Sequence, residues 1–330
     1  MIEASAPGRC GVIGNPSDLY GGSVISCSLA ERAWARLEGS PSLTVRSGDL
    51  VGEITGPGDL AQAGDYLDVI RAVLGTFWEE LPHRRFSLSC GTQVPAQSGL
   101  AGSTSLLVAL TGAVLRFIGR PLSPWEVAEQ VHRIEWGVMG TACGYQDFHI
   151  EVFGGLNYMD FRRKETLGAT GQEPWATIEP LLPYVPELPF LLASTGVERN
   201  SGAVHRPVRQ RWEEGDPEVV EAYLRITHLA AEGKKALLRG DWPALGALMN
   251  ENHAIQQSLG SSHPTCDALI DAARAAGAHG AKLAGAGNGG TIIALTTDPE
   301  ALGHRLKEAG AFRLITPKPG AGLLVSGEMA

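Results

Sequence analysis

Cysteine pairs, long apolar runs and metal-binding histidine patterns are all scarce in this sequence. The 330 residues include five cysteines, an odd number with no CxxC pair, so we predict neither a disulfide framework nor a thiolate zinc site. The nine histidines show no HExxH spacing, and we assign none of them to a metal. No apolar run is long enough to span a membrane, and the N-terminus has no signal-peptide core. These absences favour a cytoplasmic protein without a membrane partner.

Positive charge is also in short supply. The formal net charge is −9, so nucleic acid is not expected as the main partner, because binding to a phosphate backbone needs a basic surface. The chain is long enough, at 44% hydrophobic residues, to form two domains around one cleft. The composition predicts a globular protein in which any anionic ligand must meet a local basic patch.

The first half of the chain alternates short β-type runs with turns rich in Gly, Pro and Asp. The expected strands are 12–13, 23–29, 43–45 and 86–90. A capping-box sequence at Ser123, Pro124 and Glu126 predicts a helix that carries Glu135 near its end. The Pro-containing segment 163–189 is expected to connect two domains, which we place at residues 1–170 and 185–330.

Three helices with clear ends are predicted in the second half. Asp216, Asp241 and Ser262 should begin them, and they should close near residues 240, 260 and 277. A strand is expected at 190–193. A final pair of strand-like runs at 291–295 and 322–325 predicts that the helices pack on one face of a sheet. The order of strands and helices indicates the α+β class.

The segment from Pro95 to Leu110 is a loop rich in Gly and Ser that runs directly into an apolar, helix-like sequence. Small residues let backbone N–H groups approach an anion, and the first turn of a helix adds unpaired N–H groups and the positive end of its dipole. The Lys of a P-loop is absent. We interpret the segment as a phosphate-binding loop; the alternative is an ordinary turn before a buried helix.

A second glycine cluster occupies residues 282–290. It contains GxGxxG, but a β-type run follows it rather than a helix, and no acidic residue stands where a ribose contact would need one. We interpret it as a loop between two strands, pressed against a ligand or against the first glycine loop. A plain hairpin turn is the alternative.

Two acids and one cation stand in polar turns of the first half. Asp147 follows Gly144 and could accept a proton from a substrate hydroxyl or cap the helix that follows it. Arg9 and Asp18 would suit a polyhydroxylated, anionic ligand, and Asp18 would equally suit an Asx turn. Each of these residues has a structural role open to it as well as a functional one.

In their order along the chain, these segments resemble the motifs of the GHMP kinase family, which includes galactokinase, homoserine kinase, mevalonate kinase and phosphomevalonate kinase. The first motif matches APGRCGVIGNPSD, the ATP-phosphate motif VPAQSGLAGSTS, and the third motif KLAGAGNGGTIIAL. Within the family, the segments GNPSDLYGG and GYQDFHIEVFGGLNYMDF look most like glucuronokinase. The second of these segments also resembles heptose 7-phosphate kinases, whereas MNENHAIQQSLG resembles mevalonate kinase. The resemblance implies an N-terminal domain like ribosomal S5 domain 2 and a ferredoxin-like C-terminal domain.

The resemblance also implies roles for single residues. Asp147 matches the acid that faces the substrate hydroxyl, and Arg9 matches the cation that stabilises the transferred charge. Thr104 matches the residue whose hydroxyl contacts Mg²⁺. Glu135 precedes Asp147 by about the distance in sequence at which some family members have a second metal ligand. The residues expected to bind ATP are Pro95, Ser98, Gly99, Leu100, Ala101, Gly102, Ser103, Thr104, Ser105 and Gly287. Those expected to bind the substrate are Asn15, Ser17, Asp18, Gln146 and Asp147.

Taken together, these roles imply phosphorylation, by ATP and Mg²⁺, of a hydroxyl of a sugar or sugar acid, with the anomeric hydroxyl of glucuronate as first choice. Phosphoryl transfer needs positioning, charge neutralisation and a group that orients the hydroxyl. A mevalonate kinase, a heptose 7-phosphate kinase and a non-catalytic nucleotide- or sugar-binding protein of the same fold are the alternatives, and a homodimer is compatible with all of them. The candidate partners for an acceptor carboxylate are Arg133, Arg162, Arg199, Arg206 and Lys282.

Overall fold

A long twisted sheet dominates the N-terminal half of the computed structural model, which describes residues 1–164, 174–185, 187–197 and 201–328. Strands β1 (Ile2–Ile13) and β2 (Ser23–Gly39) pair antiparallel along most of their length. The strand order is β12-β1-β2-β5-β3-β4, with β6 paired to β2 and β7 paired to β6. The other members are β3 (Thr44–Ser47), β4 (Leu50–Glu53), β5 (Phe86–Thr92), β6 (Leu156–Asp160), β7 (Thr177–Pro180) and β12 (Leu324–Gly327).

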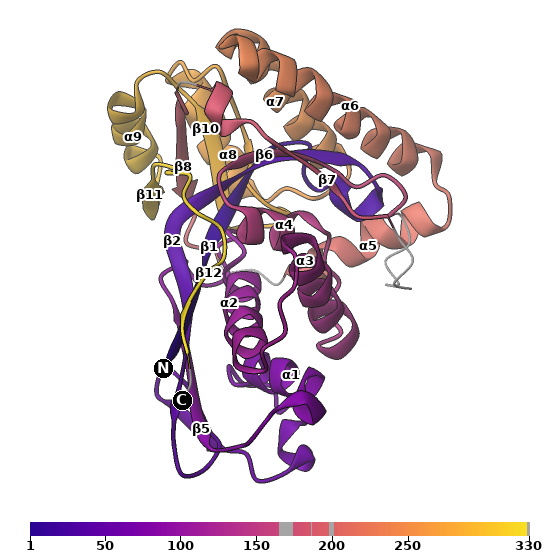
Figure 1. Ribbon diagram of the computed structural model, residues 1–330. Coiled ribbons are helices and arrows are strands. Elements are labelled where there is room, and N and C mark those ends of the chain that lie inside the picture. The colour runs from indigo at the N-terminus through magenta and orange to yellow at the C-terminus, as the bar shows by residue number, and fades with distance from the viewer. Residues whose placement is uncertain (165–173, 186, 198–200, 329–330) are drawn as a thin grey trace.

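Four helices cover one face of this sheet (Figure 1). They are α1 (Asp68–Thr76), α2 (Gly102–Phe117), α3 (Pro124–Arg133) and α4 (Gln146–Phe153). The capping box is confirmed, because the Ser123 hydroxyl accepts from the Glu126 N–H and the Glu126 carboxylate accepts from the Ser123 N–H. A π-helical turn, η4 (Ile134–Val138), continues α3 and carries Glu135, as the sequence predicted.

A smaller sheet of four antiparallel strands forms the C-terminal half. Its strands are β8 (Phe190–Ser194), β9 (Gly280–Leu283), β10 (Thr291–Leu295) and β11 (Arg313–Ile315), in the order β11-β8-β10-β9. Numbered along the chain, this order is fourth, first, third and second, which is the ferredoxin-like arrangement. The accompanying helices are α5 (Ser201–Glu213), α6 (Pro217–Arg239), α7 (Trp242–Ser258), α8 (Pro264–Ala275) and α9 (Pro299–Glu308).

Two of the three predicted helix starts are confirmed. Asp216 caps α6 and Asp241 caps α7, and each helix continues with a Pro in its first turn. The third helix, α8, begins one residue later than predicted, since His263 is its N-cap and the Ser262 hydroxyl instead donates to Asp267. Among the described residues, the structure contains no helix that is both long enough and apolar enough to cross a membrane.

Helix packing and strand pairing in the C-terminal half correct two expectations. The small sheet buries both of its faces: α8 and α9 cover the side of Ile292, whereas α6 and α7 pack on the side of Ile293. The last strand also belongs elsewhere, because β12 pairs with β1 in the register Ile2 to Gly327. The expectation that the runs 291–295 and 322–325 belong to one sheet is therefore wrong: alternation in a sequence marks a strand but does not choose its neighbour. The division into residues 1–170 and 185–330 stays a prediction.

Candidate active site

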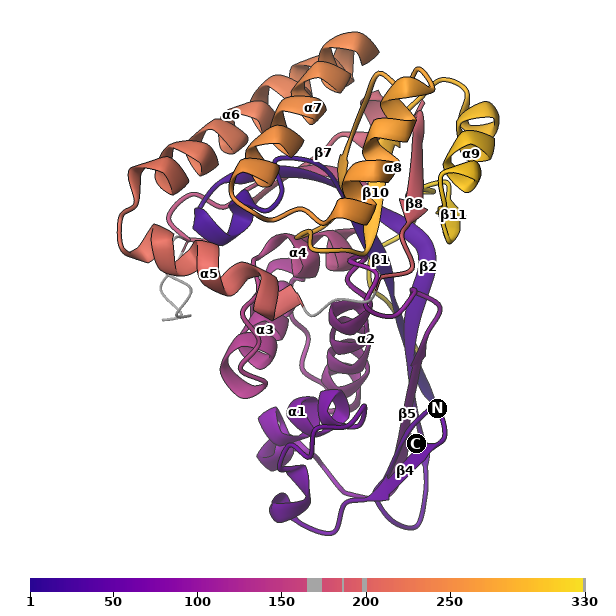
Figure 2. The same ribbon diagram turned by 180° about the vertical axis from the view of Figure 1, so that it is seen from behind.

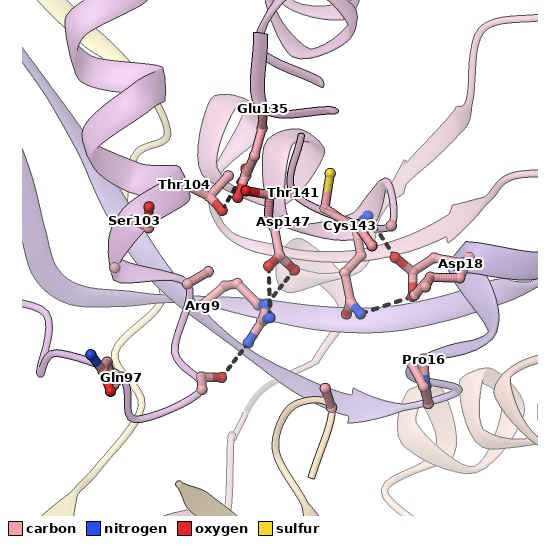
Figure 3. Close-up of a pocket in the computed structure, with 18 of the residues that line it drawn as sticks. Arg9, Pro16, Asp18, Gln97, Ser103, Thr104, Glu135, Thr141, Cys143 and Asp147 are labelled. Carbon is pink, nitrogen blue, oxygen red and sulfur yellow. Dashed lines mark hydrogen bonds and ion pairs between the residues drawn. The ribbon is translucent and has the colours of Figure 1, made fainter. Parts of the chain in front are cut away.

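A pocket of about 350 Å³ lies where strand β1, the turn η1 (Ser17–Tyr20), the loop before α2 and the start of α4 meet (Figure 3). The predicted site residues that line it are Arg9, Asp18, Ser98, Gly99, Ala101, Gly102, Ser103, Thr104, Glu135, Gln146 and Asp147. Those that do not line it are Asn15, Ser17, Pro95, Leu100, Ser105 and Gly287. The first glycine loop, the early turns and the acidic turn before α4 thus converge on one cavity.

Arg9 and Asp147 form the centre of this pocket. The Arg9 Nε–H donates to Asp147 Oδ1 at 2.6 Å, and its Nη2–H donates to Oδ2 at 2.8 Å. The Nη1–H of the same guanidinium donates to the Gly99 carbonyl at 2.6 Å, which ties the fork to the glycine loop. The Asp147 side chain is still 26% exposed, so its carboxylate can meet a small molecule in the pocket. Asp147 does not cap α4, so that alternative is excluded, and its catalytic role stays a prediction.

The glycine loop turns sharply before α2. Gln97, Gly99 and Ala101 all have positive φ, and Ala101, at +61°, is the residue immediately before the helix. This geometry presents the backbone of Gly102 and Ser103, at the positive end of the α2 dipole, to the pocket. Such a surface binds phosphate groups without requiring a lysine.

Three of the predicted loop residues have structural roles instead. The Ser98 hydroxyl donates to the Pro95 carbonyl at 2.7 Å and so closes the loop, although Ser98 also lines the pocket. Leu100 is buried in the hydrophobic core, and its carbonyl accepts from the Arg9 N–H at 3.0 Å. The Ser105 hydroxyl donates back to the Gly102 carbonyl at 3.0 Å. These contacts hold the shape of the loop.

Thr104 and Glu135 meet on the α2 side of the pocket. The Thr104 hydroxyl donates to Glu135 Oε2 at 3.1 Å, and both residues are buried. Burial, followed by the negative charge of Asp147, raises the pKa of Glu135 to about 7. A buried carboxylate that has a hydroxyl beside it, and too little positive charge nearby to balance its own negative charge, is a suitable site for a divalent cation.

Asp18 holds the start of α4. Its Oδ2 accepts from the backbone N–H groups of Tyr145 at 2.9 Å and Gln146 at 3.1 Å, and its Oδ1 accepts from Gln146 Nε2 at 2.9 Å. A side chain at Gly144 would not fit, because its Cβ would lie 2.0 Å from Asp18 Oδ2. Burial, and then the negative charge of Asp147, raises the pKa of Asp18 to about 6. Asp18 therefore fixes the helix that carries Asp147, rather than closing an Asx turn.

Asn15 and Ser17 lie behind the pocket wall. Asn15 Oδ1 accepts from Lys282 Nζ at 2.6 Å, and Asn15 Nδ2 donates to the Gly285 carbonyl at 3.0 Å, which ties the early turn to the second glycine cluster. The Ser17 hydroxyl donates to the Ser23 carbonyl at 3.0 Å. In the second cluster, a Cβ on Gly287 would lie 1.8 Å from the Ser261 carbonyl oxygen, so this loop packs against protein. It joins β9 to β10, as predicted.

Sequence reasoning missed several residues of this region. The further lining residues are Pro16, Leu19, Tyr66, Gln97, Thr141, Ala142, Cys143, Gly144 and Ala286. Glu151 was missed too: it is fully buried on α4, and neither of its carboxylate oxygens has a hydrogen-bond partner among the described residues. Its position four residues after Asp147, on the same helix face, was the available signal. Burial, with Asp147 nearby, raises the pKa of Glu151 far above its ordinary value.

Comparison with protein families gives two matches. Residues 68–155 match the GHMP kinases N terminal domain, and residues 234–311 match the GHMP kinases C terminal region. A mevalonate kinase of Pyrococcus abyssi is 30% identical over 338 residues, which cover 96% of this chain and 95% of the relative. Glucuronokinase 1 of Arabidopsis thaliana is 30% identical over 311 residues, covering 88% of this chain and 84% of the relative.

A solved structure shares the whole fold. The D-glycero-D-manno-heptose 1-phosphate kinase of Bacteroides thetaiotaomicron superposes with a TM-score of 0.77 and covers 100% of both chains at 21% identity. At that identity the likeness concerns the fold alone.

Proposed function

Since this chain belongs to the GHMP kinase family, and is thus a phosphotransferase with an alcohol group as acceptor, we propose that it transfers the ATP γ-phosphate to a hydroxyl of a sugar acid. The predicted family and fold class are confirmed. One observation carries the proposal: the Arg9 fork holds both oxygens of Asp147 and the Gly99 carbonyl of the phosphate-binding loop. The phosphate-binding loop, the cation Arg9 and the proposed proton acceptor Asp147 are therefore adjacent.

The residues of the pocket fit ATP and Mg²⁺. The glycine loop and the start of α2 offer backbone N–H groups to phosphates. Thr104 and Glu135 would hold the cation, which when bound neutralises phosphate charge. Among the residues that the structure describes, no group of three or more His, Cys, Asp or Glu forms a metal site, and two protein ligands are typical of Mg²⁺ that also binds phosphates.

In the proposed reaction, Asp147 orients the acceptor hydroxyl and takes its proton at Oδ1 or Oδ2. Arg9 keeps this carboxylate aimed into the pocket and places positive charge beside the transferred group. Gly99 positions the guanidinium by accepting its third N–H. Asp18 fixes the first turn of α4, so Asp147 cannot swing away. These residues suffice for a direct transfer without a covalent enzyme intermediate.

The pKa of Glu135 predicts a Mg²⁺ requirement that depends on pH. Its carboxyl group must lose a proton to bind the cation, so protons compete with the metal below a pKa of about 7. Between about pH 8 and about pH 6, the free Mg²⁺ needed for half-maximal activity should rise by about tenfold. Titration of activity with Mg²⁺ at saturating ATP measures this. In Glu135→Gln the requirement should be high and independent of pH; a flat profile in the unsubstituted protein would contradict the role of Glu135.

Glucuronate is the proposed acceptor, phosphorylated at its anomeric hydroxyl. The 30% identity to glucuronokinases of Arabidopsis and the polar wall formed by Asp18 and Gln146 beside Asp147 support it. Mevalonate is the second candidate, because relatives named mevalonate kinase match at up to 30% identity over nearly the whole chain. Both compounds are hydroxy acids, so both candidates require recognition of a carboxylate.

An ADP-release assay with Mg²⁺ and ATP distinguishes these acceptors. The panel comprises glucuronate, galacturonate, galactose, heptose 7-phosphate and mevalonate, with phosphorus NMR on each product. Turnover with glucuronate and an anomeric phosphate in the product is the expected result. Turnover with mevalonate alone would show that mevalonate, not glucuronate, is the acceptor. If ATP binds but no compound of the panel is phosphorylated, a non-catalytic binding protein would be favoured.

A further inference from the structure

Within the described ranges, the charged side chains that line the pocket include no unpaired cation that could bind the carboxylate of an acceptor. Asp18, Glu135 and Asp147 are acidic, and Arg9 is the basic residue among the described lining residues. Arg9 already donates to both oxygens of Asp147. A hydroxy acid would therefore bring a further negative charge into an acidic pocket, and its binding calls for a cation near the rim.

Three of the five cations expected from the sequence have their side chains in the described part of the chain, and none of these three meets this need. Arg162 is 82% exposed and pairs with Asp160. Lys282 is fully buried and donates to Asn15, behind the wall. Arg133 lines a different hollow, beside Trp175. Arg199 and the side chain of Arg206 lie outside what the structure describes.

Helix α5 belongs to the C-terminal half and packs against elements that form the pocket. Figure 2 shows it below α6, next to the N-terminal helices α3 and α4. Val208 and Trp212 pack into one cluster with Leu19 and Tyr20 of the turn η1, and the rings of Trp212 and Tyr20 are 5.2 Å apart. Because Leu19 lines the pocket, this packing holds α5 against one of its walls.

Arg209 extends from the same helix to Trp136 of the turn η4. Its guanidinium carbon lies 5.2 Å from the ring centre of Trp136, the residue next to Glu135. Its Nε–H donates to Glu213 Oε1 at 2.7 Å, and in the described part of the chain no acceptor bonds to its two terminal nitrogens. Burial raises the pKa of Cys143, a lining residue, and the charge of Arg209 opposes that rise. Arg209 thus lies against Trp136, the neighbour in sequence of the lining residue Glu135.

On the basis of the function proposed above, we propose that Arg209 binds the carboxylate of the acceptor with its two terminal nitrogens. The guanidinium is held by Trp136 on its face and by Glu213 at Nε, and it is only 17% exposed, so little freedom is lost on binding. A planar fork suits a carboxylate in two-point contact. Arg209 then selects hydroxy acids over neutral sugars, while Asp147 and Arg9 perform the transfer.

The test compares Arg209→Gln with Arg211→Gln. Arg211 lies on the same helix but pairs with Asp216 and Glu218, at 2.7 Å and 2.6 Å, away from the pocket. Arg209→Gln should raise the KM for glucuronate by about 10- to 100-fold, with the KM for ATP and kcat changed by less than about threefold. Glucose, which has a hydroxymethyl group in place of the carboxylate, should show no such change. Arg211→Gln should resemble the unsubstituted protein, and Arg209→Lys should recover part of the loss.

Binding by calorimetry, with Mg²⁺ and a non-hydrolysable ATP analogue, separates this proposal from the proposed function. Weaker glucuronate or mevalonate binding in Arg209→Gln supports the carboxylate contact even where no turnover is seen. If mevalonate is the acceptor, mevalonolactone replaces glucose as the uncharged control. Unchanged binding in Arg209→Gln, equal losses for charged and neutral acceptors, or binding of no hydroxy acid by the unsubstituted protein would each overturn the role of Arg209.

Discussion

Replacing Asp147 with asparagine is expected to lower kcat by about 10³-fold while ATP still binds. The amide cannot accept the acceptor's proton. The amide also turns an NH₂ group towards Arg9. In the unsubstituted protein, the Nε–H and Nη2–H of Arg9 donate to the two carboxylate oxygens of Asp147. The phosphate-binding loop keeps its other contacts, including the Arg9 bond to the Gly99 carbonyl. Turnover is measured by ADP release and ATP affinity by calorimetry.

Glu151→Gln is the matched control for this prediction. Glu151 lies one helical turn from Asp147 on α4; it is fully buried, has no hydrogen-bond partner among the described residues, and burial raises the pKa of its carboxyl group well above the ordinary value. A neutral amide of the same shape should leave kcat within about threefold. Near-normal turnover in Asp147→Asn would show that another group accepts the proton, and an equal loss in both variants would point to damage to α4 rather than to chemistry.

Arg9→Met is expected to lower kcat by about 10²- to 10³-fold. Methionine has a similar length but provides neither the charge nor the three N–H donors that hold Asp147 and Gly99. The Asp147 carboxylate would then lose its fixed orientation, and the loop would lose its side-chain link to β1 while keeping the backbone bond from residue 9 to the Leu100 carbonyl.

Arg36→Met provides the comparison for Arg9→Met. Arg36 lies on β2, and its guanidinium pairs with Glu3 on the exposed side. Its loss should leave kcat unchanged and shift the melting temperature only slightly. Arg9→Lys should fall between Arg9→Met and the unsubstituted protein, because an ammonium keeps the charge but not the planar fork. Full activity in Arg9→Met would remove Arg9 from the transfer step.

Several contacts of the site were beyond the reach of sequence reasoning. The glycine loop and its helix were predictable because small residues before an apolar periodic run specify a local structure. The pairing of Arg9 with Asp147, 138 positions apart, was not, because it depends on where β1 and α4 meet. Asp18 was expected at the substrate, which stays a prediction, and the sequence did not reveal that its carboxylate also accepts from the N–H groups of Tyr145 and Gln146. Arg209 carried no local signal, since a single arginine on an exposed-looking helix is ordinary.

The sequence by itself determined the α+β class, most of the helix ends and the family, because caps, turn residues and motif spacing act between near neighbours in the chain. Only the tertiary structure decided which strand β12 pairs with, and which residues of the glycine loop face the pocket and which support the loop. Those outcomes depend on sheet register and on packing between residues more than a hundred positions apart, such as Asp18 and Gln146. Local preferences do not encode contacts of that kind.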